Sequence, residues 1–290
     1  MGRGRASRTI LLEAQCADIL EEIQPATVRA VGYRAFVRKL IPDMSRNSMQ
    51  RIGRVLIQAR ESDVIPWSWI VDETRDLERV STWADPDAYR HTVSRAYRKD
   101  FWRQQPNEIE AWSEKGTMRG TLKPVLDRYG VGFRVMHGYG SATVIMDIAH
   151  RTRHLDRPLE VLYLGDWDPS GMHMSAKDLP DRLAKYGARV HLTRLALTPD
   201  DLTLPDVRIT SFPATDKKAD ARYPWFVRNY GQDCWELDAL SPVLVRDRVE
   251  AAIDSLIDRD AWDHDIRLEQ VQLDSLNAVM TTWANLASAS

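Results

Sequence analysis

The sequence predicts an α/β protein in which a helical N-terminal domain precedes a domain built on a parallel β-sheet. From residue 108 onward, apolar runs that suit strands alternate with amphipathic runs that suit helices, which is typical of βαβ units. In the first 60 residues the apolar side chains recur at helical spacing instead. A length of 290 residues is sufficient for two such domains.

Three helices are expected before residue 63. The first spans residues 7–24 and ends at Pro25, and Thr27 is the predicted N-cap of the second. The third helix begins near residue 46, and its apolar face consists of Met49, Ile52, Leu56 and Ile57. Its other faces carry the basic side chains Arg46, Arg51, Arg54 and Arg60. Residues 63–75 predict a short β segment.

This order of helix, helix, basic helix and β segment is typical of a winged helix-turn-helix, whose third helix enters the major groove of DNA. We therefore interpret residues 1–24 as an N-terminal helix and residues 25–105 as a winged-helix DNA-binding domain. The charges agree, because residues 1–60 carry a net charge of +6 in a chain whose total is −2. Charge alone also allows a solvated surface without a partner.

The second domain is expected over residues 106–240. Residues 76–107 are polar, aromatic-rich and helical in character, and they precede the run IEAWSEKG at 109–116, which predicts a short strand followed by a turn. Later strands are predicted near residues 131–136, 159–165 and 188–197, with helices between them at 117–130, 141–155 and 172–187. Residues 241–290 predict C-terminal helices. The fold class is therefore a Rossmann-like parallel sheet preceded by an α-rich domain.

Acidic residues follow two of the predicted strands. Glu114 closes the first strand, and Asp166 and Asp168 close the run VLYLGDWDPSG at 161–171. Ligands of open parallel sheets collect at the carboxyl ends of strands. Two adjacent carboxylates repel each other, and a hard divalent cation such as Mg²⁺ removes that cost. The alternative is that Asp166 caps the next helix while Asp168 is solvated.

The combination of Glu-Lys-Gly after the first strand, the glycine-rich turn HGYGS at 137–141 and GDWDPSG after a later strand resembles a Toprim domain. More narrowly, residues 25–240 resemble the A subunit of topoisomerase VI and the related meiotic double-strand-break protein. In that family a CAP-like winged-helix domain precedes the Toprim domain, and the segment CWELDALSP at 234–242 is similar to short bacterial or phage-type members. The resemblance implies a DNA-cleaving activity of the isomerase or nuclease class.

The resemblance also implies roles for individual residues. The family carries a tyrosine nucleophile four residues after an arginine, and RAVGY places Arg29 and Tyr33 at these positions. Glu114, Asp166 and Asp168 would then hold Mg²⁺, or Mn²⁺, against the scissile phosphate, with Glu114 also a candidate acid or base. The expected partners are double-stranded DNA, a second copy of the chain that exchanges active-site groups, and a separate B-type ATPase subunit. An aromatic residue usually precedes the family's tyrosine, whereas this chain has Gly32.

Other interpretations remain open from the sequence. The same fold could support a hydrolytic nuclease in which Tyr33 is structural, or a DNA-binding dimer without catalysis. Arg34 and Lys115 are further candidates for phosphate contact, together with Arg46, Arg51 and Arg54. Glu236 and Asp238 either supplement the metal site or, as the simpler expectation, form salt bridges with the C-terminal helices.

Composition argues against several classes of protein. No run of about 18 apolar residues is present, and the basic N-terminus lacks the apolar core of a signal peptide. Cys16 and Cys234 are few and far apart, which favours free thiols in a reducing compartment. We therefore expect a cytoplasmic, nucleoid-associated protein without a membrane partner.

Overall fold

The fold was analysed in a computed structural model that describes residues 7–71, 81–136 and 142–288. Contacts divide the chain into two compact units, which are described separately. The first contains Met1–Thr74 and Ile109–Ser255, and the second contains Arg75–Glu108 and Leu256–Ser290. This division differs from the predicted boundaries at 25–105 and 106–240, because the N-terminal helices and the sheet pack into one unit.

The N-terminal part of the first unit is helical, as predicted. Its elements are α1 (Ser7–Ile23), β1 (Ala26–Thr27), α2 (Val28–Val37), α3 (Arg46–Glu61), the 3₁₀ turn Trp67–Trp69 and β2 (Ile70–Val71). Thr27 is the N-cap of α2, because its side chain accepts a hydrogen bond from the backbone N–H of Ala30. Within the segment predicted to be β, a 3₁₀ turn leads into the two-residue strand β2, which pairs in parallel with β1. The structure thus does not establish a winged helix.

A core of buried apolar residues joins these helices. Leu20 of α1, Val31 of α2 and Leu56 of α3 are each 1% exposed or less. The apolar periodicity of the sequence predicted this packing, since each helix turns one apolar stripe toward the other two. Three of the basic side chains of α3 are exposed as predicted, namely Arg46, Arg51 and Arg54. Arg60 is instead buried and donates hydrogen bonds to the carbonyls of Trp67 and Ile70.

The sheet of the first unit has four parallel strands in the order β4-β3-β5-β6. These strands are β3 (Glu108–Ser113), β4 (Gly132–Val135), β5 (Leu159–Leu164) and β6 (Val190–Ala196). After β5 and a loop at 165–168, three helical segments follow one another without a break: α7 (Pro169–His173), a π-helical turn (Met174–Asp178) and α8 (Leu179–Lys185). The predicted α/β fold with a parallel sheet is therefore confirmed at this level.

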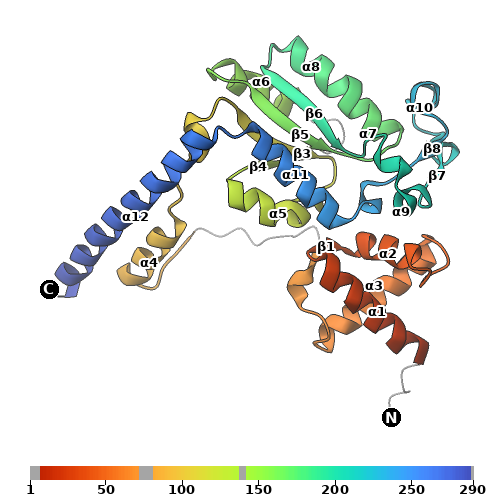
Figure 1. The fold of residues 1–290 in the computed structure, drawn as a ribbon, viewed down its shortest axis with the longest axis horizontal. Coiled ribbons are helices and arrows are strands. Elements are labelled where there is room, and N and C mark those ends of the chain that lie inside the picture. The colour runs from red at the N-terminus through yellow and green to blue at the C-terminus, as the bar shows by residue number, and fades with distance from the viewer. Residues whose placement is uncertain (1–6, 72–80, 137–141, 289–290) are drawn as a thin grey trace. The chain divides into compact units, whose positions relative to one another are not determined.

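Helices cover both faces of this sheet (Figure 1). Helices α6 (Ala142–Arg153) and α8 pack on one face, where Ile145 and Leu183 join Val161 in a buried cluster. Helices α5 (Met118–Tyr129) and α11 (Pro242–Leu256) lie on the other face and are joined through the carboxylate of Glu250. With helices on both faces, the carboxyl ends of the strands are occupied by loops.

The segment after β6 contains short elements that return to the sheet edge. They are the 3₁₀ turns Asp201–Thr203, Ala214–Lys217 and Leu237–Ala239, the helices α9 (Pro205–Arg208) and α10 (Tyr223–Tyr230), and the antiparallel strands β7 (Phe212–Pro213) and β8 (Asp233–Cys234). Both cysteines are free and buried, which agrees with the prediction of free thiols.

The second unit is helical. It contains α4 (Pro86–Ala96), the 3₁₀ turn Phe101–Gln104 and the long helix α12 (Arg259–Ser288). The hydroxyl of Tyr97 donates a 2.6 Å hydrogen bond to Gln272, and the ring of Trp262 packs against Phe101 and Trp102. In the described part of the chain, no helix has the length and apolar character needed to cross a membrane.

Candidate functional site at the sheet edge

The predicted acidic residues lie where two neighbouring strands end. Glu114 follows β3, and Asp166 and Asp168 follow β5, which is adjacent to β3 in the sheet. The backbone N–H of Asp166 donates a 3.3 Å hydrogen bond to Oε1 of Glu114. Asp168, rather than Asp166, caps the next helix: its Oδ1 accepts a 2.8 Å hydrogen bond from Gly171, and the residue is buried. The expectation that Asp168 is solvated was therefore wrong.

These three carboxyl groups interact electrostatically. Burial, together with the negative charges of Asp166 and Asp168, raises the pKa of Glu114 to about 7. Burial also raises the pKa of Asp166, against the opposing effect of the Lys115 ammonium. A cation placed among these groups would lower their pKa values and relieve the repulsion.

Lys115 is the main positive charge at this edge. Its Nζ lies 2.9 Å from Oδ1 of Asp166, 2.7 Å from Oδ2 of Asp238 and 3.5 Å from Oε2 of Glu236. Burial alone would lower the pKa of Lys115, but the three carboxylates outweigh burial and raise it, so the ammonium stays charged. Lys115 was predicted to contact DNA phosphate; in the described state it neutralises the acidic edge instead.

A backbone pairing explains why Glu236 and Asp238 reach this edge. Trp167 and Trp235 exchange two backbone hydrogen bonds of 2.9 Å, which places the segment after β8 against the loop after β5. The backbone N–H of Leu237 then donates a 2.7 Å hydrogen bond to Oδ1 of Asp166. Among the described residues, Glu236 and Asp238 therefore pair with Arg29 and Lys115 and not, as expected, with the C-terminal helices.

Tyr33 lies near this cluster in the same chain, on α2. The guanidinium of Arg29 contacts the Tyr33 ring, with its Cζ 5.9 Å from the ring centroid, and also pairs with Glu236. Tyr33 is only 2% exposed. Burial and the charge of Glu236 raise its pKa to about 12, although Arg29 and Lys115 oppose the shift. The phenol is thus held neutral and covered.

The resemblance led us to expect that a second chain would place its metal site beside this tyrosine. In the described state, the charged groups that act on Tyr33 are Arg29, Lys115 and Glu236 of its own chain. Gly32 permits close packing here, because a Cβ at this position would lie 2.5 Å from Sδ of Met49. An aromatic residue in place of Gly32 would require the Met49 side chain to move.

Arg194 of β6 fixes the loop that carries the two aspartates. Its Nη2 donates to the carbonyls of Gly165, at 2.7 Å, and Asp166, while its Nε donates to the carbonyl of Leu197 at 2.7 Å. Its Nη1 donates to Gly171 and to the Ser175 hydroxyl, so all the guanidinium hydrogens are engaged. These hydrogen bonds from a partly buried guanidinium fix the position of Asp166 and of the start of α7 relative to the sheet.

The donor set suits a hard divalent cation. The contacts above use one carboxyl oxygen of Glu114 and one of Asp166, which leaves the second oxygen of each available as a ligand. The backbone packs closely there: a Cβ at Gly171 would lie 2.5 Å from the carbonyl oxygen of Asp166 and 3.1 Å from Oε1 of Glu114, so only glycine fits at this position without a shift. The chemistry of the residues therefore fits Mg²⁺ or Mn²⁺.

The carboxylates of Glu114, Asp166 and Asp168 do not converge on a single point in the structure. Among the described residues, no three or more His, Cys, Asp or Glu side chains are grouped so that they could hold a metal ion. Lysines bind the carboxylates instead: Lys115 pairs with Asp166, and Nζ of Lys217 lies 3.2 Å from Oδ2 of Asp168. Metal binding would consequently require these side chains to rearrange.

The other predicted DNA-binding residues fall into two groups. The first group lies on the exposed face of α3 and consists of Arg46, Arg51 and Arg54. Arg34 instead lies against the rest of its own unit, where it pairs with Asp206 at 3.2 Å and donates a hydrogen bond to the carbonyl of Ala239. Only the α3 group is therefore presented to solvent as predicted. The glycine-rich turn at 137–141 lies outside the described residues.

Sequence reasoning did not single out Lys217 or Arg194 as parts of the site. Both lie far along the chain from the acidic residues that they bind, and neither belongs to a motif. Lys217 occurs in a charged stretch, TDKKADAR, that reads as an ordinary solvated surface. No local signal could have identified either residue.

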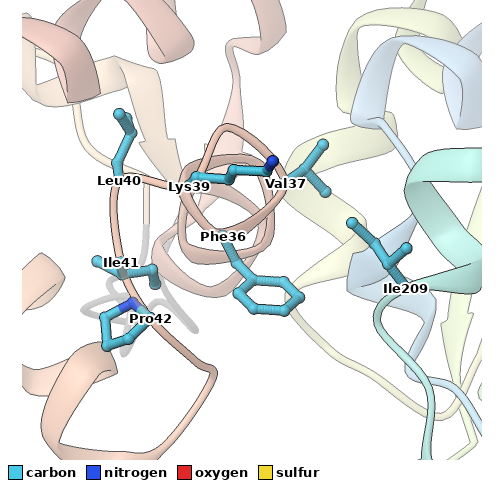
Figure 2. Close-up of a pocket in the computed structure, with 7 residues that line it drawn as sticks. All are labelled: Phe36, Val37, Lys39, Leu40, Ile41, Pro42 and Ile209. Atoms are coloured by element: carbon cyan, nitrogen blue, oxygen red, sulfur yellow. The ribbon is translucent and has the colours of Figure 1, made fainter.

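A cavity elsewhere in the first unit lacks this chemistry. It measures about 510 Å³ and lies at the C-terminal end of α2, opposite Ile209 (Figure 2). Its lining is mostly apolar and consists of Phe36, Val37, Lys39, Leu40, Ile41, Pro42 and Ile209. None of the predicted site residues contributes to it.

Comparison of the chain with known protein families, with curated proteins and with solved structures found no match.

Proposed function

We propose that this chain is a divalent-metal-dependent DNA-binding protein that cleaves DNA strands by transesterification, with Tyr33 as the nucleophile. The observation that carries the proposal is the coupled acidic edge formed by Glu114, Asp166 and Asp168 at the ends of parallel strands. The motif resemblance to the Toprim domain of topoisomerase VI A subunits points to the same reaction. The exposed basic face of α3 supplies a surface for duplex DNA.

In this reaction Oη of Tyr33 forms a bond to phosphorus while one P–O bond to a sugar breaks. The phenol loses its proton, and the departing sugar oxygen gains one. Glu114 is the candidate to donate or accept a proton in this step. Arg29 would stabilise the phenolate and the charge on phosphate, and a metal ion held by Glu114, Asp166 and Asp168 would neutralise the phosphate oxygens.

Tyr33 must become accessible before it can react. The Arg29–Glu236 ion pair covers it, and this pair is partly exposed on the Arg29 side. A DNA phosphate is negatively charged, as the Glu236 carboxylate is, so we expect DNA to compete with Glu236 for the guanidinium of Arg29. Release of Glu236 would also lower the pKa of Tyr33, since Glu236 is one of the groups that raise it.

A second function, a hydrolytic nuclease on the same acidic edge, is favoured by one observation. Tyr33 is 2% exposed and has a pKa raised to about 12, which are properties of a structural tyrosine. In this alternative, water replaces the phenol as the nucleophile, and both products carry free ends. The same metal-binding residues would be required.

The deciding experiment incubates the full-length chain with supercoiled plasmid and Mg²⁺ or Mn²⁺, followed by denaturation. Protein covalently attached to DNA ends in the wild type, but not in Tyr33→Phe, supports transesterification. Cleavage that persists in Tyr33→Phe without an adduct supports hydrolysis. Asp166→Ala should bind DNA and lack both activities. DNA binding without cleavage under any of these conditions would contradict both and indicate a non-catalytic DNA-binding dimer.

The partners implied by the resemblance remain proposals. A homodimer would bring two cleavage sites to the two strands of one duplex. A separate B-type ATPase subunit would be needed for strand passage, whereas the cleavage step proposed here does not require ATP. Sedimentation of the chain with and without duplex DNA tests the first of these proposals.

A further inference from the structure

Lys217 is placed differently from the other cations of the site. It ends the 3₁₀ turn Ala214–Lys217, and its Nζ lies 3.2 Å from Oδ2 of Asp168. Its side chain is 44% exposed, whereas the side chain of Asp168 is only 8% exposed. A solvent-accessible ammonium thus covers a buried carboxylate from the outside.

The ion pair between Lys217 and Asp168 involves Oδ2, the carboxyl oxygen that does not cap α7. Oδ1 is engaged by the N–H of Gly171 as the cap of α7. Oδ2 is therefore the oxygen that a metal ion would need, and Lys217 occupies it. Lys115 differs, because it is 20% exposed and bound to three carboxylates.

Without a metal ion, the ammonium of Lys217 neutralises the carboxylate of Asp168 from a distance of 3.2 Å. If a divalent ion took the place of the ammonium at Asp168, the lysine would remain charged beside a site that attracts phosphate. Its flexible four-carbon stem allows such a move without a change in the backbone.

We propose that Lys217 is a displaceable counter-ion that competes with the divalent metal for Asp168 and, once displaced, binds a backbone phosphate of the DNA substrate. This inference rests on the proposed metal-dependent cleavage of DNA and adds a substrate-binding residue to it. It also accounts for the lack of a ready-made metal cluster among the described side chains, since a lysine holds one of the ligands.

The test compares Lys217→Gln with Lys218→Gln, which removes the same charge from the adjacent, exposed residue. Mn²⁺ binding to the full chain is measured by electron paramagnetic resonance without DNA. Loss of the competitor should tighten Mn²⁺ binding about fivefold in Lys217→Gln, while Lys218→Gln and the charge-preserving Lys217→Arg stay close to wild type. Merely structural damage would weaken binding instead, and thermal unfolding without metal identifies a variant that does not fold.

The second measurement uses DNA at saturating Mn²⁺. Lys217→Gln should raise the KM for DNA more than it lowers kcat, and it should reduce the slope of log affinity against log salt by about one unit. Metal binding or DNA affinity in Lys217→Gln that equals that of Lys218→Gln would overturn the inference while leaving the cleavage proposal intact. A wild-type chain that binds no Mn²⁺ would overturn both.

Discussion

The ammonium of Lys115 lies 2.9 Å from Oδ1 of Asp166, and this ion pair joins the ends of two neighbouring strands, β3 and β5. The same ammonium reaches Asp238, whose Oδ1 accepts a 2.8 Å hydrogen bond from the side chain of Thr27 at the start of α2. One lysine therefore connects the acidic edge of the sheet with the helix that carries Tyr33.

Replacement of Lys115 by Met should destabilise the first unit by about 3 kcal/mol, because buried carboxylates lose their counter-charge. Urea denaturation at pH 7.5 measures this change. Lys123→Met is the matched control, since its exposed pair with Asp127 should contribute less than about 1 kcal/mol. Mg²⁺ should restore part of the stability of Lys115→Met. Equal stabilities of the two variants would contradict the central role of Lys115.

Glu114 should make stability depend on pH. Its pKa is about 7 in the folded chain against 4.5 in the reference state, so the folded state binds more protons between these values. Stability should therefore fall as the pH rises from 4.5 to 7 and level off above 7. Glu114→Gln should remove this fall and be more stable than the wild type at pH 8, by on the order of 2 kcal/mol.

Urea denaturation at pH 5 and pH 8 measures this difference. Glu108→Gln, which changes a carboxyl group at the start of β3, is the control. Metal affinity in the wild type should rise with pH through 7, because Glu114 must lose its proton to act as a ligand. A wild-type profile that matches Glu114→Gln would show that the carboxyl group is not perturbed.

Arg194→Gln should destabilise the chain by about 3 kcal/mol or more, since several buried carbonyls lose their donor at once. It should also weaken Mn²⁺ binding, because the loop with Asp166 and the start of α7 would no longer be held. Arg228→Gln, on the exposed face of α10, should affect neither property. Unchanged metal affinity in a folded Arg194→Gln variant would contradict its positioning role.

The arginines of α3 should contribute to DNA affinity independently of sequence. Arg51→Gln and Arg54→Gln should each weaken binding and reduce the salt slope by about one unit, because each phosphate contact releases counterions. Fluorescence anisotropy with a duplex at several salt concentrations measures the effect. Lys123→Gln, on the exposed face of α5, is the control for loss of charge. Slopes equal to wild type in both arginine variants would place the DNA elsewhere.

Mixing two inactive variants tests whether chains exchange active-site groups. Tyr33 lies beside Arg29, Lys115 and Glu236, which border the acidic edge of the same chain, so a mixture of Tyr33→Phe and Asp166→Ala should form no covalent adduct. The plasmid assay described above, with wild-type chain as the positive control, supplies the measurement. An adduct in the mixture would instead show that a tyrosine of one chain meets the acidic edge of the other.

The helices, the strands and the acidic candidate site residues could be predicted from the sequence, because each of them depends on a local pattern. Helical spacing of apolar residues predicted α1 to α3, and alternation of strand and helix patterns predicted the parallel sheet. Glu114, Asp166 and Asp168 could be singled out because the ends of parallel strands meet at one edge. Thr27 was identifiable as a cap because capping depends on neighbouring residues alone.

Only the tertiary structure decided which charges meet at that edge. Lys217, Glu236 and Asp238 come from distant segments, and the pairing of Trp167 with Trp235 that brings the last two to the site leaves no local sequence signal. The burial of Tyr33 likewise depends on contacts across the fold. The physical reason is that periodicity records which side of an element is apolar, whereas a pairing between remote charged groups is set by the packing of the whole unit.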